Sequence, residues 1–213
     1  MKKNKLVIWF VVLVLVVPIV AFGLLRYSES HFKNLPYYGD SYQEQDRTKA
    51  YQVSSFRFTN QDGKETTGDF TSGKIWVVCY FFTRCPSICP KMISGMGDVQ
   101  EKFKNEEALK MVSFTVDPEH DTPEILNNYA HSKGINTKQW KLVTGTKQDL
   151  YRYARRELKL VATDGDGGPG DFIHSDRLVL LDKQNHIRGY YDGTAPSEVK
   201  QLIRDIERLL TTN

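Results

Sequence analysis

Residues 75–82 form an unbroken apolar run that is mostly β-branched and aromatic. A strand without polar positions is typical of a sheet that is covered on both faces. Helices must then lie on both sides of the sheet, which favours a chain in which strands and helices alternate. A second run of the same kind at residues 109–116 supports this interpretation.

The remaining patterns complete the alternation and close it with a hairpin and a helix. This order predicts an α/β protein with a thioredoxin-like fold and an N-terminal β-hairpin extension. The expected elements are a hairpin turning at Asn60-Gln61-Asp62-Gly63, a helix with Met92, Met96, Val99 and Phe103 on one face, a helix starting at Thr122-Pro123-Glu124, a strand at 140–143, a helix near 150–158, a hairpin at 178–191 and a helix at 196–210.

Residues 6–25 are almost continuously apolar, and Lys2, Lys3 and Lys5 precede them. Twenty helical residues at ~1.5 Å each reach across a bilayer core of ~30 Å. A cleavable signal peptide would have a shorter apolar region that ends in small residues. We therefore expect a basic cytoplasmic tail at residues 1–5 and one transmembrane helix at residues 6–25.

The lysines before the apolar run also predict the orientation of the chain. The positive-inside rule leaves the N-terminus in the cytoplasm, so the C-terminal domain of a single-pass inner (cytoplasmic) membrane protein would face the periplasm. Residues 26–51 lack periodicity and predict a spacer, and residues 52–213 have the length of one domain. The net charge of +3 equals the three lysines, so the exported part is neutral and has no basic excess for nucleic acid.

The stretch Thr83-Arg84-Cys85-Pro86-Ser87-Ile88-Cys89-Pro90 lies where the first buried strand gives way to its helix. Ligands bind at this edge of open α/β sheets. Cysteines four residues apart fall on one face of a helical turn, which suits two thiolates on one metal ion and also permits a disulfide. The N-terminus of the helix is expected to favour the thiolate form of both cysteines.

Together with Val116-Asp117-Pro118-Glu119-His120-Asp121-Thr122-Pro123 and Asp171-Phe172-Ile173-His174-Ser175, this stretch resembles the Sco (SenC) family. The resemblance covers residues 52 to the C-terminus. It implies copper as the bound metal, with Cys85, Cys89 and His174 as its ligands. It also implies that the protein delivers copper to the CuA-bearing subunit of cytochrome c oxidase or keeps the thiols of that site reduced.

The residue types agree with this ligand set. Two thiolates and one imidazole suit an ion that cycles between Cu(I) and Cu(II), whereas zinc prefers a fourth ligand that is not evident here. His174 also precedes a strand that is expected to end beside the two cysteines. An acidic residue is frequent in the family at the position of Ser87. This position is not a ligand, so the difference is expected to affect partner recognition and not copper binding.

Several other residues receive a structural interpretation. Cys79 lies inside the buried strand and is expected to act as a small hydrophobe. Met92 and Met96 fit the core face of their helix. Asp117 and Asp121 are expected to form a turn and cap a helix, in preference to a direct role in copper transfer.

Two further functions use the same cysteines. An enzyme, either a thiol-disulfide oxidoreductase or a thiol peroxidase, would work through Cys85 or Cys89. Reductases of the thioredoxin type usually have a cis-proline facing the pair, and His174 stands about there instead, which favours metal binding. A redox or copper sensor would differ only in its partner. Besides the oxidase subunit, the expected partners are the membrane and a thiol reductant or another copper donor.

Overall fold

The computed structural model describes residues 9–10, 12–24, 35–39, 50–160 and 175–211. The chain divides into two compact units, Met1–Leu35 and Pro36–Asn213. In the first unit residues 12–24 are helical and their large apolar side chains are exposed. Among the residues that the structure describes, no helix is both long enough and apolar enough to cross a membrane.

The second unit is built on one mixed sheet of seven strands, in the order β2-β1-β5-β4-β3-β6-β7. Strands β3, β4 and β5 are parallel, and β1, β6 and β7 pair antiparallel to their neighbours. The predicted α/β class and both hairpins are confirmed. The strands are β1 (Arg57–Asn60), β2 (Glu65–Thr67), β3 (Ile75–Phe81), β4 (Leu109–Thr115), β5 (Trp140–Thr144), β6 (Arg177–Leu181) and β7 (Ile187–Asp192).

Strand β3 lies near the middle of the sheet, and all seven of its residues are buried. Trp76, Val78 and Tyr80 pack into an aromatic-rich core on one face of the sheet. Because side chains alternate along a strand, Cys79 and Phe81 point to the other face. The continuous apolar run therefore reflects burial on both faces, as predicted.

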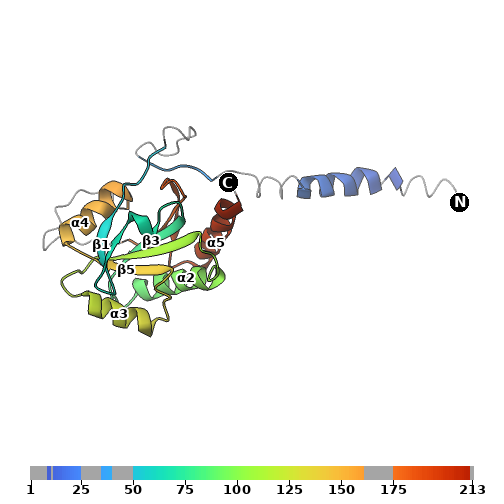
Figure 1. Ribbon diagram of the computed structural model, residues 1–213. Helices are drawn as coiled ribbons and strands as arrows, with labels where there is room; N and C mark the ends of the chain where they lie inside the picture. The colour runs from blue at the N-terminus through green and yellow to red at the C-terminus, as the bar shows by residue number, and fades with distance from the viewer. Residues whose placement is uncertain (1–8, 11, 25–34, 40–49, 161–174, 212–213) are drawn as a thin grey trace. The chain divides into compact units, whose positions relative to one another are not determined.

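Helices cover both faces, and α2 and α5 run side by side (Figure 1). Thr122 caps α3 by accepting a hydrogen bond from the Ile125 N–H, as expected from the sequence. The helices are α2 (Ile88–Lys102), α3 (Pro123–Ser132), α4 (Lys147–Arg152) and α5 (Pro196–Thr211), with a short 3-10 turn, η2 (Gly68–Phe70), and a π-helical turn, η3 (Tyr153–Glu157).

The helix predicted near residues 150–158 differs in its last part. After α4 the chain widens into the π-helical turn η3, and the Leu158 N–H donates to the Tyr153 carbonyl, five residues back. Tyr153 and Ala154 both remain in the core. Periodicity alone does not distinguish this wider turn from a regular α-helix, because the same side chains face the sheet.

Residues 36–38 lie against the edge strand β7. Tyr38 donates its N–H to the Ile187 carbonyl over 3.0 Å, and Arg188 donates through Nε to the Pro36 carbonyl over 3.1 Å. The guanidinium of Arg188 also stacks 4.0 Å from the ring centre of Tyr37. Part of the predicted spacer is therefore in contact with the folded domain, while the boundary at residue 52 stays a prediction.

Candidate functional site

The cysteine loop, residues 82–87, connects the carboxyl end of β3 to the first turn of α2. The Cys85 N–H donates to the Phe82 carbonyl over 3.3 Å, which closes a turn directly after the strand. Helix α2 begins only at Ile88, so the expectation that both cysteines share one helical turn is wrong. Pro86 explains the difference, because a residue before proline is disfavoured in the α conformation.

The two cysteines nevertheless meet. Both are free thiols, and their exposed fractions are only 8% for Cys85 and 3% for Cys89. The Cys89 N–H points at the Cys85 sulfur over 3.4 Å. Ser87 occupies the cap position of α2 without a side-chain cap bond, so the sulfur of Cys85 accepts one of the N–H groups that a cap would normally take.

The two sulfurs have different acidities. Burial raises the pKa of Cys85, but hydrogen bonds from the backbone of Ser87, Cys89 and Ile88 and from the Cys89 thiol outweigh it, so this pKa falls below its ordinary value. Burial raises the pKa of Cys89 to about 12, and the neighbouring Cys85 adds to this rise. The direction of the pKa shift agrees with the expected preference for thiolate at Cys85 and contradicts it at Cys89, where desolvation dominates.

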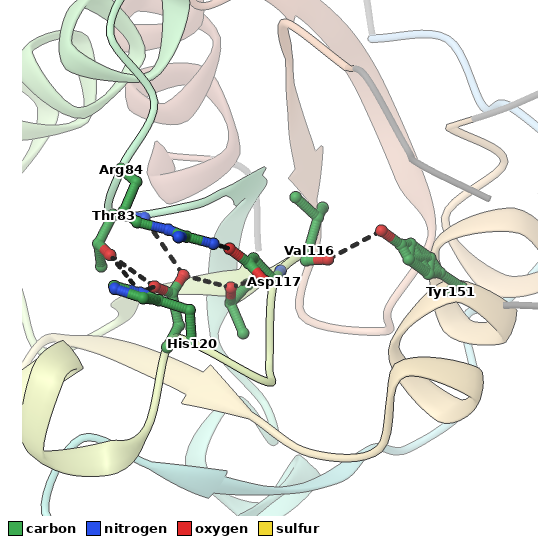
Figure 2. Close-up of polar contacts among 8 residues, drawn as sticks. Thr83, Arg84, Val116, Asp117, His120 and Tyr151 are labelled. Atoms are coloured by element: carbon green, nitrogen blue, oxygen red, sulfur yellow. Dashed lines mark hydrogen bonds and ion pairs between the residues drawn. The ribbon is translucent and has the colours of Figure 1, made fainter. Parts of the chain in front are cut away.

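The loop between β4 and α3 lies beside the cysteine loop at the same end of the sheet (Figure 2). Arg84 forms an ion pair with Asp117 over 2.5 Å. The Thr83 N–H and hydroxyl both donate to the carboxylate of Asp121, over 3.2 and 2.5 Å. The two residues that precede Cys85 are therefore both held by carboxylates of the neighbouring loop.

The roles predicted for Asp117 and Asp121 are partly wrong. The Asp117 carbonyl does accept turn hydrogen bonds from the N–H groups of His120 and Asp121. Neither carboxylate caps α3, because Thr122 already does so. Asp121 is instead fully buried and also accepts a hydrogen bond from the Thr115 hydroxyl over 2.5 Å.

Tyr129 on α3 is a neighbour of the cysteines that the sequence did not single out. Its ring centre lies 5.6 Å from that of Phe81 at the end of β3. Burial raises the pKa of Tyr129 to about 12, and the charges of Cys89, Cys79, Cys85 and Asp121 contribute to the rise. The helical pattern could have suggested only that Tyr129 faces the sheet.

The third cysteine and the two methionines of α2 lie in the core of the domain. Cys79 is fully buried with its sulfur 3.0 Å from the Ser113 hydroxyl, and burial raises its pKa to about 12. Met92 and Met96 are fully buried in the core. His174 lies outside the described residues, and among those residues no group of three or more His, Cys, Asp and Glu side chains is arranged to hold a metal ion.

Residues 44–211 match a protein-family model described as SCO1/SenC. The SCO1 protein homolog of Bacillus subtilis (strain 168) is 30% identical over 163 residues, which are 76% of this chain and 84% of that relative. A putative copper-binding protein of Stutzerimonas stutzeri is 26% identical over 161 residues, 74% of this chain and 76% of the relative.

A similar fold occurs in the solved structure of BsSco, which is described as containing a disulfide switch and as a member of the Sco family of cytochrome c oxidase assembly proteins. The two chains are 29% identical, and the match has a TM-score of 0.65 over 76% of this chain and 95% of the other. This likeness agrees with the thioredoxin-like order of strands and helices around β3.

Proposed function

Because the chain belongs to the SCO1/SenC family, we propose that it binds one copper ion through Cys85, Cys89 and His174 and serves in the assembly of cytochrome c oxidase. The observation that carries this proposal is the pair of free thiols that meet at the carboxyl end of β3. The names of the relatives agree with it, since one is a putative copper-binding protein and another a member of a family of oxidase assembly proteins.

The donor atoms fit copper. Thiolate sulfur is the preferred ligand of Cu(I), and imidazole nitrogen helps to hold Cu(II). The hydrogen bonds that lower the pKa of Cys85 prepare one thiolate in advance. The proton on Cys89 must leave when copper binds, so metal binding releases protons.

The position of His174 in the chain also supports the ligand set. Strand β6 pairs antiparallel to β3, with Val179 opposite Val78. The start of β6 at Arg177 is therefore at the edge of the sheet where β3 ends. His174 precedes Arg177 by only three residues in the sequence, which supports its inclusion in the proposed ligand set.

A copper titration under anaerobic conditions tests this proposal. The reduced full-length protein is expected to bind one copper per chain, and Cys85→Ser, Cys89→Ser and His174→Ala each weaken Cu(II) binding severely. His174→Ala spares Cu(I) more than either serine variant does, because the thiolates supply the affinity for the soft ion. Cys79→Ala is the matched control and keeps the full stoichiometry, since its sulfur is buried within the sheet. Cu(II) spectra that do not change in His174→Ala would remove the histidine from the site.

The recipient that we propose is the CuA-bearing subunit of cytochrome c oxidase. A thiol reductant or another copper donor would act before it, because a dithiol that oxidises to a disulfide cannot bind the metal until it is reduced. Mixing the copper-loaded protein with the soluble CuA domain distinguishes copper delivery from the maintenance of thiols. Metal delivery transfers copper to the domain, whereas thiol maintenance reduces a disulfide in it without transfer.

We also propose that residues 6–25 anchor the protein in the inner membrane with its C-terminal domain in the periplasm. Three lysines before the apolar residues support this orientation. After mild reduction, a membrane-impermeant thiol reagent is expected to modify Cys85 and Cys89 in spheroplasts. Labelling that requires a broken inner membrane would contradict the orientation and, with it, delivery to a CuA domain outside the cytoplasm.

A thiol-disulfide oxidoreductase or thiol peroxidase is the second candidate, and the different acidities of the two cysteines favour it. Cys85 resembles an attacking thiolate and Cys89 a protonated resolving thiol. Steady-state assays with a disulfide substrate and with a hydroperoxide distinguish an enzyme from a metallochaperone. Many turnovers per chain without copper would favour the enzyme, while one exchange per chain would favour delivery.

A further inference from the structure

The carboxylate of Asp121 joins two loops at the end of the sheet where the cysteines lie. Its side chain is fully buried. One oxygen accepts a hydrogen bond from the Thr83 hydroxyl over 2.5 Å and lies 3.0 Å from Nδ1 of His120. The other oxygen accepts from the Thr83 N–H over 3.2 Å and from the Thr115 hydroxyl over 2.5 Å.

Such a cluster of bonds is strong. Hydrogen bonds to an ionised acceptor are about twice as strong as those between neutral groups, and a buried site shields them from water. Thr115 is the last residue of β4, and its backbone is fixed in the parallel sheet opposite Phe81. Through Asp121, the rigid end of β4 therefore holds Thr83, which stands two residues before Cys85.

The position of Cys85 follows from that of Thr83. The turn from Phe82 to Cys85 is closed by one backbone hydrogen bond of 3.3 Å. The Cys85 sulfur then reaches the N–H of Cys89 at the start of α2. In a disulfide this sulfur would have to move to about 2.05 Å from the Cys89 sulfur. Closing the disulfide therefore moves the Cys85 sulfur from its present position beside the Cys89 N–H, and a loop that is held in place resists this movement.

We propose that Asp121 is a positioning residue that stabilises the dithiol form of the Cys85–Cys89 pair by holding Thr83. This inference rests on the proposed function only in taking the pair as the reactive group. Weakening the hold on Thr83 is then expected to favour the disulfide and to lower the reduction potential of the pair. The effect does not require copper.

Equilibration of the metal-free full-length protein with glutathione tests the proposal. One glutathione disulfide oxidises the two protein thiols to a disulfide and is itself reduced to two glutathione thiols, which take up the two protons. In Asp121→Asn, the equilibrium constant for this oxidation is expected to rise about tenfold, which lowers the potential by ~30 mV. An unchanged or higher potential would overturn the proposal.

Asp182→Asn is the matched control, because this carboxylate is also buried but lies in the turn between β6 and β7. It is expected to lower the free energy of unfolding in urea without moving the potential. If Asp182→Asn shifted the potential as much as Asp121→Asn does, the effect would be a general loss of stability and the positioning role would fail.

A second pair of variants keeps the test independent of the folding of Asp121→Asn. Thr83→Val removes the hydroxyl donor and keeps the volume, and it is expected to raise the same equilibrium constant about threefold. Thr83→Ser retains the hydroxyl and is expected to keep the wild-type equilibrium constant. Equal potentials in the valine and serine variants would overturn the proposal. If the wild-type protein bound no copper, the proposed function would be contradicted. The reduction potentials of these metal-free variants would still test the role of Asp121.

Discussion

At the carboxyl end of β3, Asp121 accepts hydrogen bonds from Thr83 and Thr115, which lie 38 and 6 residues away and belong to different elements. At the opposite end, Asp182 accepts hydrogen bonds from the N–H groups of Gln184 and His186 and from the guanidinium of Arg188. All of these donors belong to the β6–β7 hairpin. Both carboxylates are buried.

The difference lies in what each carboxylate holds together. Asp182 closes a hairpin whose turn has no cysteine and whose donors are close in sequence. Asp121 joins the cysteine loop to the end of β4 through long-range contacts. A cavity of about 230 Å³ near Asn185 and Trp76 is lined by residues of the Asp182 end and by none of the cysteine loop. The comparison indicates that Asp182 stabilises the fold, whereas Asp121 also holds the loop that carries Cys85.

The largest expected effect is on stability at the Asp182 end. Asp182→Ala leaves the guanidinium of the buried Arg188 without its carboxylate, which is expected to cost about 3–5 kcal/mol of the free energy of unfolding. Urea denaturation measures this loss. Copper stoichiometry of the fraction that remains folded is expected to stay at the wild-type value, and a lower stoichiometry would break the distinction between the two ends.

The next effect concerns the reactivity of the two sulfurs at the other end. Because the pKa of Cys85 is lowered and that of Cys89 is raised to about 12, Cys85 carries far more thiolate near pH 8. Its alkylation by iodoacetamide is expected to be at least ~10-fold faster, even after allowing for the lower nucleophilicity of a more acidic thiol. Mass spectrometry of briefly labelled, reduced protein gives the ratio. Equal rates would show that the loop does not distinguish the two thiols.

A smaller effect comes from Cys79, which lies inside β3 between the two ends. Burial raises its pKa to about 12 in the folded protein, so the folded state binds more protons than the unfolded state above the ordinary thiol pKa. Stability is therefore retained below about pH 9 and lost as the pH rises toward about 12. At pH 10 the resulting loss in the free energy of unfolding is on the order of 1 kcal/mol.

Comparison of wild type with Cys79→Ala isolates this contribution. The variant loses packing at every pH but is expected to show a flatter decline of the unfolding free energy between pH 7 and pH 10. Urea denaturation at both pH values provides the measurement. Parallel declines in the two proteins would show that Cys79 ionises as easily in the folded state as in the unfolded state.

The smallest effect is expected for Arg84→Gln. Its ion pair with Asp117 links the cysteine loop to the loop after β4, but 59% of the arginine side chain is exposed. Exposed ion pairs contribute about 0–1 kcal/mol, and salt screens them. The free energy of unfolding and the glutathione equilibrium are expected to change little, in contrast to those of Asp121→Asn. A tenfold shift in the equilibrium would move the positioning role from Asp121 to the exposed pair.

Much of the fold was predictable because its signals are local. The run at β3 shows burial on both faces, and Thr122-Pro123 marks the start of α3 by its own chemistry. The cysteine pair was recognisable for the same reason, since Cys85 and Cys89 are four residues apart. His174 stays a prediction, because it lies outside the described residues.

The parts that were not predictable depend on distant residues. Thr83 and Asp121 are 38 residues apart, and only the parallel pairing of β3 and β4 brings them together. Asp121 stands beside the cap residue of α3, so its sequence context suggested capping when its carboxylate is in fact occupied elsewhere. The high pKa of Cys89 likewise results from burial by surrounding elements, whereas the helix terminus alone suggested a thiolate.

The contact of residues 36–38 with β7 determines how the domain responds to tension on the chain that precedes it. A pull on that chain loads the hydrogen bonds to Ile187 and Arg188 first, at the outer edge of the sheet. Strand β6 separates this edge from β3. Mechanical load is therefore expected to enter the domain at β7, with β6 between the loaded edge and the strand that leads into the cysteine loop.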